Sequence, residues 1–507
     1  MNGLRGAAEV LQRLLREQLG ETWGTRLWRD NQEIIRLYEI YDGKGQAWAT
    51  RGKPDYTPTK RITNHIKHLI KEEARFMLSR APEIAIVPRE NGGDANAALC
   101  AQLEAHVREV LEASGWSQKL TSAGRDCFIG KRVALKVHAQ AGELPRVQFR
   151  PSLEFYHDVE YDDAERLTRV IFAYHQNHAE DPARQRLWVQ TYRLEGGRCL
   201  VDEFLYNGLG ARIETVCEDQ DTGLAEIPVY IILNDAMTGD LTGESDVAGL
   251  VPLQDAYNRM TSDDQDALRF NMFPQRIFAD ASQECLEKIQ ITPGGIVDLQ
   301  TDPAAIDRQA KYGLLEAGFG YHDRIEGALE RVMSDMYQIM GVPKATVEDY
   351  KGVAASGKAM RALYWPLITR CEEKWAAWDA ALTWLVRMLV AIDGAYGANR
   401  FGAAQYSVKI EHLWPITEDE EEERERDLKE VRDQVRSRKS YMEKWQPQAD
   451  SEEELRQIKA EQALLEDAYA GAIGDELNGR IPESPGWRAP DSAGGDRRGE
   501  QGDSRGL

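Results

Sequence analysis

The sequence predicts an α+β protein in which long α-helices predominate. Three observations support this prediction: apolar residues at helical spacing near the N-terminus, short β-branched and aromatic runs in residues 83–216, and long helical patterns in residues 245–392. The chain has 507 residues, which is too long for a single hydrophobic core, so about two to four structural units are expected.

The N-terminal segment, up to Tyr41, is predicted to form two helices with an interruption near Gly20 and Gly24, because glycine weakens a helix. Residues 43–60 are rich in Gly, Pro and Thr and are predicted to form a loop. Helical spacing returns in residues 64–78 and ends before Pro82.

Residues 83–216 are predicted to be mainly β-structure, with one helix at residues 96–112. Gly196, Gly197 and the turn at 208–210 favour antiparallel hairpins, so a parallel Rossmann-type sheet is disfavoured. The runs that predict strands are EIAIVP, RVALKVHA, RVQFRP, RVIFAYHQ, RLWVQTYRL and CLVDEFLY, followed by IPVYIILN.

Two long helices of similar length are predicted on either side of a small β-rich insert. Ser245 is a candidate N-cap for the first helix, and the sequence GVP ends the second. The insert, residues 272–312, contains PQRIFAD and TPGGIVDLQTDP. The apolar positions at helical spacing are Val247, Leu250, Val251, Tyr257, Met260, Ala267 and Leu268 in the first helix, and Leu315, Phe319, Ile325, Leu329, Val332, Met336 and Ile339 in the second.

Residues 343–356 are predicted to form a loop, followed by a third long helix at residues 357–392. Pro366 lies inside this helix and is expected to kink it near Leu363, because proline has no backbone N–H to donate. The run YSVKIEHLW then predicts a strand.

The C-terminal part is highly charged over residues 417–471. Residues 418–426 hold seven acids and two bases, which usually indicates a solvated helix face and alternatively a rim that repels DNA. Residues 476–507 are too polar and too rich in Gly and Pro to form a core, so a disordered tail is predicted.

The charge of the chain excludes a generic polyanion-binding protein. The net charge is −22, yet residues 1–80 hold 15 Lys+Arg against 10 Asp+Glu, or +5, which leaves −27 for the rest. An acidic surface repels DNA phosphates, so a protein of this charge would guide DNA without gripping it.

The six cysteines form no CxxC pair, which fits neither a disulfide framework nor a zinc site and predicts reduced thiols. No uninterrupted run of 18 apolar residues occurs, because Arg387 breaks the longest candidate, residues 380–392. The N-terminus lacks the apolar region of a secretory signal. We therefore expect a cytoplasmic protein with no membrane partner.

One run comes close to a nucleotide-binding motif. Gly352 to Lys358 match the phosphate-loop pattern G-x-x-x-x-G-K, but Ala359 follows, which has no hydroxyl for a magnesium ion. The preceding ATVEDYK is not an apolar strand. A loop that leads into a helix capped by Ser356 is therefore favoured.

Two groups of polar residues were considered as metal sites. His65, His68 and Glu72 could share a helix face, but their spacing is not H-E-x-x-H. Residues 157–163 are acidic but lack the glycine and the terminal glutamate of a calcium loop. No catalytic residue, cofactor or metal is therefore predicted.

Several segments occur in an order that we recognise. They are YEIYDGKG, NHIK, LSRAPEI, IPVYIILN with Gly239, GESDVAGLVPLQDAYNRMTSDDQDAL, MGVP, GVAASGKAMR and the acidic C-terminal helices. In this order the chain resembles the portal proteins of tailed bacteriophages, specifically those of siphovirus-like phages of Gram-positive hosts. The resemblance spans about residues 37–471.

The resemblance implies a virion protein without enzymatic activity. It would form a dodecameric ring at one capsid vertex, assembled in the host cytoplasm, through which double-stranded DNA is packaged and later ejected. The implied partners are further copies of the chain, the terminase large subunit, the head-completion adaptor, and the major capsid and scaffold proteins.

The resemblance also implies an architecture and a set of site residues. The wing would comprise residues 1–240 and 357–416, the stem helices 241–271 and 315–342, the clip 272–314, the tunnel loop 343–356, the crown 417–475 and a disordered tail 476–507. The implied sites are Val347, Glu348, Asp349, Tyr350 and Lys351 near DNA, Gln275, Arg276, Thr292, Pro293, Gly294 and Gly295 on the docking surface of the clip, and Asp246, Asp255, Asn258, Asp263 and Asp264 in the stem.

Two other functions stay open. The charged C-terminal helices are compatible with a helical head-morphogenesis scaffold or adaptor that has no DNA channel. The run that ends at Lys358 leaves a P-loop-like nucleotide hydrolase as the least favoured alternative.

Overall fold

The computed structural model divides the chain into two units, Met1–Ile416 and Thr417–Leu507, here called the first and second unit. The structure describes residues 12, 21–45, 57–89, 93–163, 165–177, 181–272, 275–288, 299–304, 308–315, 320, 322–344, 357–416, 420–445, 453–461 and 463.

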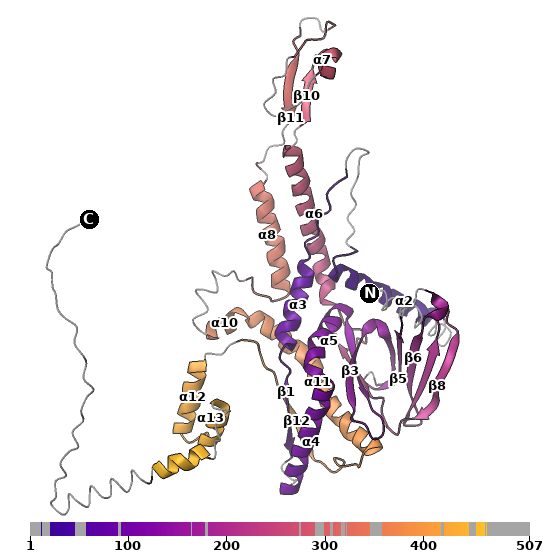
Figure 1. The fold of residues 1–507 in the computed structure, drawn as a ribbon, viewed down its shortest axis with the longest axis vertical. Helices are drawn as coiled ribbons and strands as arrows, with labels where there is room; N and C mark the ends of the chain where they lie inside the picture. The colour runs from indigo at the N-terminus through magenta and orange to yellow at the C-terminus, as the bar shows by residue number, and fades with distance from the viewer. Residues whose placement is uncertain are drawn as a thin grey trace, which may run out of the picture. The chain divides into compact units, whose positions relative to one another are not determined.

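The described residues of the first unit form four antiparallel sheets (Figure 1). A five-stranded meander has the order β4-β5-β6-β7-β8, and a three-stranded sheet has the order β3-β2-β9. Two further sheets pair β1 with β12 and β10 with β11. The strands are β1 (Glu83–Pro88), β2 (Arg132–His138), β3 (Arg146–Pro151), β4 (Phe155–Val159), β5 (Leu167–His175), β6 (Leu187–Glu195), β7 (Arg198–Tyr206), β8 (Arg212–Asp221), β9 (Val229–Leu233), β10 (Gln275–Ala279), β11 (Lys311–Leu315) and β12 (Tyr406–Glu411).

Helices pack around the three-stranded sheet. Helix α5 packs on β2 and β3, and α11 packs on β9 and β2. The helices of the first unit are α2 (Glu21–Tyr41), α3 (His65–Leu78), α4 (Gly93–Ala113), α5 (Trp116–Gly130), α6 (Asp246–Met272), α7 (Gln283–Lys288), α8 (His322–Ile339), α10 (Gly357–Leu363) and α11 (Trp365–Tyr396), with 3-10 turns η1 (Ser152–Glu154) and η2 (Pro182–Arg184).

Helix α11 forms the centre of the core. By length and composition alone it could cross a membrane. However, its large apolar side chains are buried inside the first unit, as expected for a core helix. Those at most 2% exposed include Trp375, Trp378, Leu382, Leu385 and Leu389.

Many sequence-based boundaries are confirmed. Asn64 caps α3 by accepting a hydrogen bond from the backbone of Lys67, and the helix ends at Ser79. Gly196 and Gly197 have positive φ angles in the β6–β7 turn. The expected kink near Leu363 is a break between α10 and α11.

Other sequence-based expectations were wrong. Helix α2 continues through Gly24, since one glycine costs a helix only about 1 kcal/mol; the interruption predicted near Gly20 lies outside the described residues. The second of the paired helices was expected to include Leu315, but Leu315 ends strand β11 and the helix begins at His322. This helix has 18 residues against 27 in α6, so the two are not of similar length. Strands β4 and β8 and helices α5 and α7 were not predicted.

The thiols agree with the prediction of reduced cysteines. Cys100, Cys127, Cys199, Cys217 and Cys371 are free, and all but Cys217 are buried. Burial raises the pKa of the Cys199 thiol to about 11, so this thiol is protonated and unreactive at neutral pH.

A lysine is buried between the two larger sheets. Lys136 of β2 is 3% exposed, donates a hydrogen bond to Gln190, and lies 4.9 Å from the ring centroid of Phe172 and 5.0 Å from that of Trp188. Burial, and secondarily the nearby Arg150, lowers its pKa to about 7.

Stability is therefore expected to depend on Lys136 above pH 7. The unfolded chain holds this proton up to about pH 10, whereas the folded chain releases it near pH 7, so the free energy of unfolding rises with pH in between. The free energy of unfolding of the wild type should therefore rise by up to about 1.4 kcal/mol per pH unit relative to that of Lys136→Met. Urea titrations at pH 7, 8 and 9 measure this difference, and parallel pH profiles would contradict the expectation.

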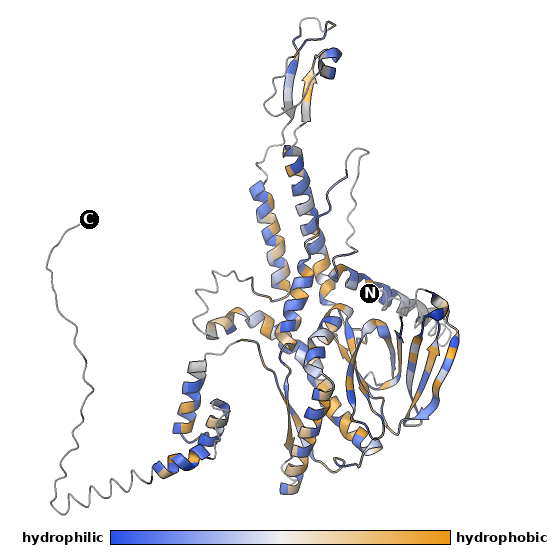
Figure 2. Cartoon of the chain, viewed as in Figure 1, coloured by the Kyte–Doolittle hydropathy of each residue, from blue (hydrophilic) through white to orange (hydrophobic). Residues whose placement is uncertain are grey.

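In the second unit, α12 (Glu420–Arg432) and α13 (Arg438–Trp445) form a helical hairpin, and residues 453–461 are helical. Figure 2 shows that α12 is largely hydrophilic. Asp427 is 2% exposed and accepts hydrogen bonds from Lys444 Nζ at 2.8 Å and Trp445 Nε1 at 2.9 Å, which fixes α13 against α12.

Candidate functional site

Helices α6 and α8 lie side by side, and the hairpin β10–β11 is inserted between them in the chain (Figure 1). Ser245 caps α6 as predicted: its hydroxyl accepts from Val247 N at 3.3 Å and donates to the carbonyl of Ile129 at 2.7 Å. At the same end of the pair, Gly341 ends α8 with φ +64°, and an added Cβ would lie 3.0 Å from the backbone of Pro366. The start of α6 and the end of α8 are thus both fixed to the core, whereas β10 and β11 lie at the opposite end of the pair (Figure 1).

The five predicted stem residues all lie on α6, in three different environments. Asp246 and Asn258 are buried, whereas Asp263 is exposed. Asp264 is half-buried, and its carboxylate lies 3.8 Å from His322 Nδ1 of α8. Asp255 is half-buried, and burial raises the pKa of its carboxyl.

A ladder of hydrogen bonds joins α6 to residues 59–66, and the sequence analysis missed it. Four side chains of α6, spaced four residues apart from Gln254 to Asp266, accept hydrogen bonds from the backbone of this segment. Those of Gln254, Asn258 and Ser262 are at most 2% exposed. Gln254 accepts from His65 N at 2.9 Å, Asn258 from Thr63 N at 3.0 Å, Ser262 from Arg61 N at 2.9 Å and Asp266 from Thr59 N at 3.0 Å.

The ladder has a simple geometric basis. Four residues of a helix rise about 6.0 Å, and two residues of an extended segment span about 6.6 Å. Helix positions four apart therefore match extended positions two apart. Buried backbone N–H groups need acceptors, and here α6 supplies them in place of a strand.

The variant Asn258→Leu is expected to loosen this segment. Thr63 N–H would lose its buried acceptor, at a cost of about 1–3 kcal/mol, so its amide should exchange with solvent about tenfold or more faster. Hydrogen exchange followed by mass spectrometry measures this over residues 57–66. The control is Gln265→Leu, at an exposed position of the same helix; equal exchange rates in the two variants would contradict the role of the ladder.

Three buried charges and the half-buried Arg370 surround the start of α6, from three helices. Glu73 of α3 is 0% exposed, and it shares Arg370 and Lys374 of α11 with Asp246. Arg370 Nε lies 2.7 Å from Glu73 Oε1, and Lys374 Nζ lies 2.9 Å from the same oxygen. Asp246 Oδ1 lies 2.5 Å from Arg370, and its Oδ2 lies 2.5 Å from Lys374. We call these four residues the buried ion cluster.

The buried ion cluster balances two acids with two bases. Burial raises the pKa of the Asp246 carboxyl to about 6, although Lys374 opposes that rise. For Glu73 burial acts in the same direction, but Lys374 and Arg370 outweigh it and lower the pKa. Asp246 and Glu73 together raise the pKa of Lys374 against the effect of its burial. The cluster therefore locks α6 to α3 and α11 and is structural in character.

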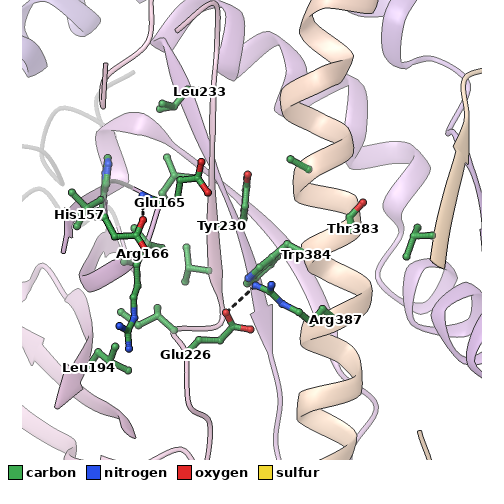
Figure 3. Close-up of a pocket in the computed structure, with 18 of the residues that line it drawn as sticks. His157, Glu165, Arg166, Leu194, Glu226, Tyr230, Leu233, Thr383, Trp384 and Arg387 are labelled. Atoms are coloured by element: carbon green, nitrogen blue, oxygen red, sulfur yellow. Dashed lines mark hydrogen bonds and ion pairs between the residues drawn. The ribbon is translucent and has the colours of Figure 1, made fainter. Parts of the chain in front are cut away.

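A large cavity lies elsewhere, between β9, α11 and β12, with a volume of about 1170 Å³ (Figure 3). Two of its arginines form ion pairs: Arg387 lies 3.1 Å from Glu226, and Arg166 lies 2.8 Å from Glu160. Burial lowers the pKa of His157, which also lines it, to about 4. The cavity contains none of the predicted site residues.

The candidate metal ligands also have structural roles. His65 contacts the ring of Tyr257 edge-on at 4.5 Å, and His68 lies 4.0 Å from Glu72. Asp158 binds Arg169 across the β4–β5 pair at 2.5 Å. The part of the chain that the structure describes contains no group of three residues able to hold a metal ion.

A family model described as "Phage portal protein, SPP1 Gp6-like" matches residues 25–465. The chain belongs to this family of portal proteins. The resemblance inferred from the order of segments is thereby confirmed at the level of the family.

Two solved structures are similar to this portal protein over most of its length. "Virion of native gene transfer agent (GTA) particle" is 13% identical, with 79% of this chain and 89% of that chain covered, at a TM-score of 0.37. "Neck of empty GTA particle computed with C6 symmetry" is 14% identical, with 82% and 92% covered, at a TM-score of 0.36. No curated protein matches the chain.

The remaining predicted sites of the portal protein lie at or beyond the limits of the described residues. Val347, Glu348, Asp349, Tyr350 and Lys351 are outside them, as are Thr292, Pro293, Gly294 and Gly295. The backbones of Gln275 and Arg276 begin β10, where they pair with Leu315 and Leu314. The near-match to a phosphate loop is described only from Gly357, which begins α10.

Proposed function

We propose that this portal protein forms a dodecameric ring at one capsid vertex of a siphovirus-like phage of a Gram-positive host, assembled in the host cytoplasm. Its axial channel would carry double-stranded DNA during packaging and ejection. The family match over residues 25–465 is the observation on which the proposal depends.

The assignment of parts follows from the order of elements. We assign residues 1–240 and 357–416 to the wing, α6 and α8 to the stem, and residues 272–314, with β10 and β11, to the clip. Residues 343–356 would form the tunnel loop and residues 417–475 the crown. The ladder and the buried ion cluster support a stem that is rigidly joined to the wing, as a ring under mechanical load requires.

The charge of the chain supports a channel that does not grip DNA. Each basic contact with phosphate adds a salt-dependent attraction that must be broken during translocation. A net charge of −22 keeps such contacts few. The ring itself requires heterologous contacts between copies that close after one turn.

Electron microscopy of the purified protein, with native mass spectrometry in parallel, tests the ring. The proposal predicts radial symmetry, a channel wide enough for a duplex and a mass about twelve times 57.3 kDa. A compact oligomer without a channel, even when capsid and scaffold are co-expressed, would instead favour the scaffold alternative.

Reversing charge in the tunnel loop is expected to slow packaging. In Glu348→Lys/Asp349→Lys, two cations per subunit would replace two anions, and the packaging rate should fall by about tenfold while rings still form. The matched control is Glu143→Lys/Glu214→Lys, which changes two exposed acids of the first unit. Normal packaging by the loop variant in an in vitro assay would refute the role of these residues.

We further propose that the clip docks the terminase large subunit during packaging and the head-completion adaptor afterwards. Gln275, Arg276 and the turn from Thr292 to Gly295 would form the docking surface. Deletion of that turn should abolish adaptor capture by the assembled ring, and retained capture would exclude the turn from docking.

A further inference from the structure

The second unit contains a groove at the turn between α12 and α13, which the assignments above do not use. Its volume is about 630 Å³. Val435 is 81% exposed and Leu428 is 47% exposed, so the floor of the groove is apolar and open to solvent. The lining residues are Leu428, Val431, Arg432, Gln434, Val435, Arg436, Ser437 and Arg438.

The rim of this groove is basic. Arg436 is held in place by Asp427, at 2.9 Å between Nη1 and Oδ1. Arg432 and Arg438 are exposed and make no ion pair with any residue that the structure describes. Two cations thus flank an apolar surface in a chain whose net charge is −22.

The same hairpin carries the complementary charge, but at its other end. Residues 418–423 read EDEEEE, and α12 begins within this acidic run. Helix α12 has 13 residues and ends at Arg432, so it is about 20 Å long. Glu420 lies 12 residues before Arg432 on the same helix, a rise of about 18 Å, so it cannot reach Arg432 or Arg438 of its own copy. A second copy can supply the run to that groove.

We propose that this groove binds the acidic run, residues 418–423, of a second copy of the chain. The inference rests on the proposed ring, in which every copy presents one face to one neighbour and a different face to the other. Arg432 and Arg438 would pair with the acids, and the aliphatic stems of the glutamates would cover Leu428 and Val435. Those two apolar residues favour a protein segment over DNA, because phosphates would leave them uncovered.

Charge-reversed variants of the full-length protein test the inference. The groove variant is Arg432→Glu/Arg438→Glu, and the rescue variant adds Glu420→Lys/Glu421→Lys to it. The matched control is Lys429→Glu/Lys409→Glu, which makes the same change of charge at exposed positions outside the groove. Native mass spectrometry measures the protein concentration at half-assembly, in low and in high salt.

The groove variant is expected to need about tenfold more protein than the control for half-assembly in low salt, a difference that shrinks in high salt. The rescue variant should return to within about threefold of wild type.

Assembly of the groove variant like the control, or failure of the rescue, would overturn the inference and leave the proposed ring unaffected. If the groove variant assembled normally but its rings no longer retained DNA, the inference would also be overturned and the groove would be assigned to nucleic acid. A wild-type chain that never forms rings would remove the proposed function itself.

Discussion

The variant Lys374→Met is expected to lower the free energy of unfolding of the first unit by about 3–5 kcal/mol. Lys374 Nζ lies 2.9 Å from Glu73 and 2.5 Å from Asp246, and both carboxylates are buried. Without this lysine, two buried anions would share Arg370 alone. Urea unfolding followed by tryptophan fluorescence, at one fixed protein concentration, measures the loss.

Two further variants make this result specific. Lys409→Met removes an exposed lysine and should change the free energy by less than about 0.5 kcal/mol. Glu73→Gln/Lys374→Met leaves one acid and one base, so it should lose less stability than Lys374→Met alone. A loss for Lys374→Met no greater than that for Lys409→Met would show that the buried ion cluster does not hold the stem to the wing.

The variant Gly243→Ala is expected to destabilise the protein by about 2–5 kcal/mol. Gly243 lies in the segment between β9 and α6 with φ +72°, where any side chain is strained. An added Cβ would lie 2.4 Å from the carbonyl oxygen of Lys131 and 2.8 Å from that of Asn234. These are backbone atoms, and Asn234 N donates to Lys131 O at 2.8 Å, so relief of the contact would disturb the pairing of β2 and β9.

Gly239→Ala in the same segment is the matched control. Gly239 has φ +81°, but an added Cβ would meet no atom within 4 Å. The control should therefore lose only the cost of the backbone conformation, about 1–2 kcal/mol. Thermal unfolding of both variants measures the difference, and equal melting temperatures would show that the close approach at Gly243 has no energetic consequence.

The candidate site was predictable in part. Ser245 and Asp246 were identified at the start of the first stem helix, and the capping role of Ser245 is confirmed. Glu73, Arg370 and Lys374 were not identified, because each reads as an ordinary charged position on its own helix. Gln254 and Asn258 were overlooked as partners of residues 63–66, since no local pattern shows that a distant extended segment lies beside them.

The sequence by itself determined where several helices begin and to which family the chain belongs. Asn64, Ser245 and Pro366 act within one turn of their own helices, so their effects can be recognised locally. Only the tertiary structure decided which charges meet. Arg370 and Glu73 are 297 residues apart and come together because α3, α6 and α11 pack around one core, and that packing depends on the whole path of the chain.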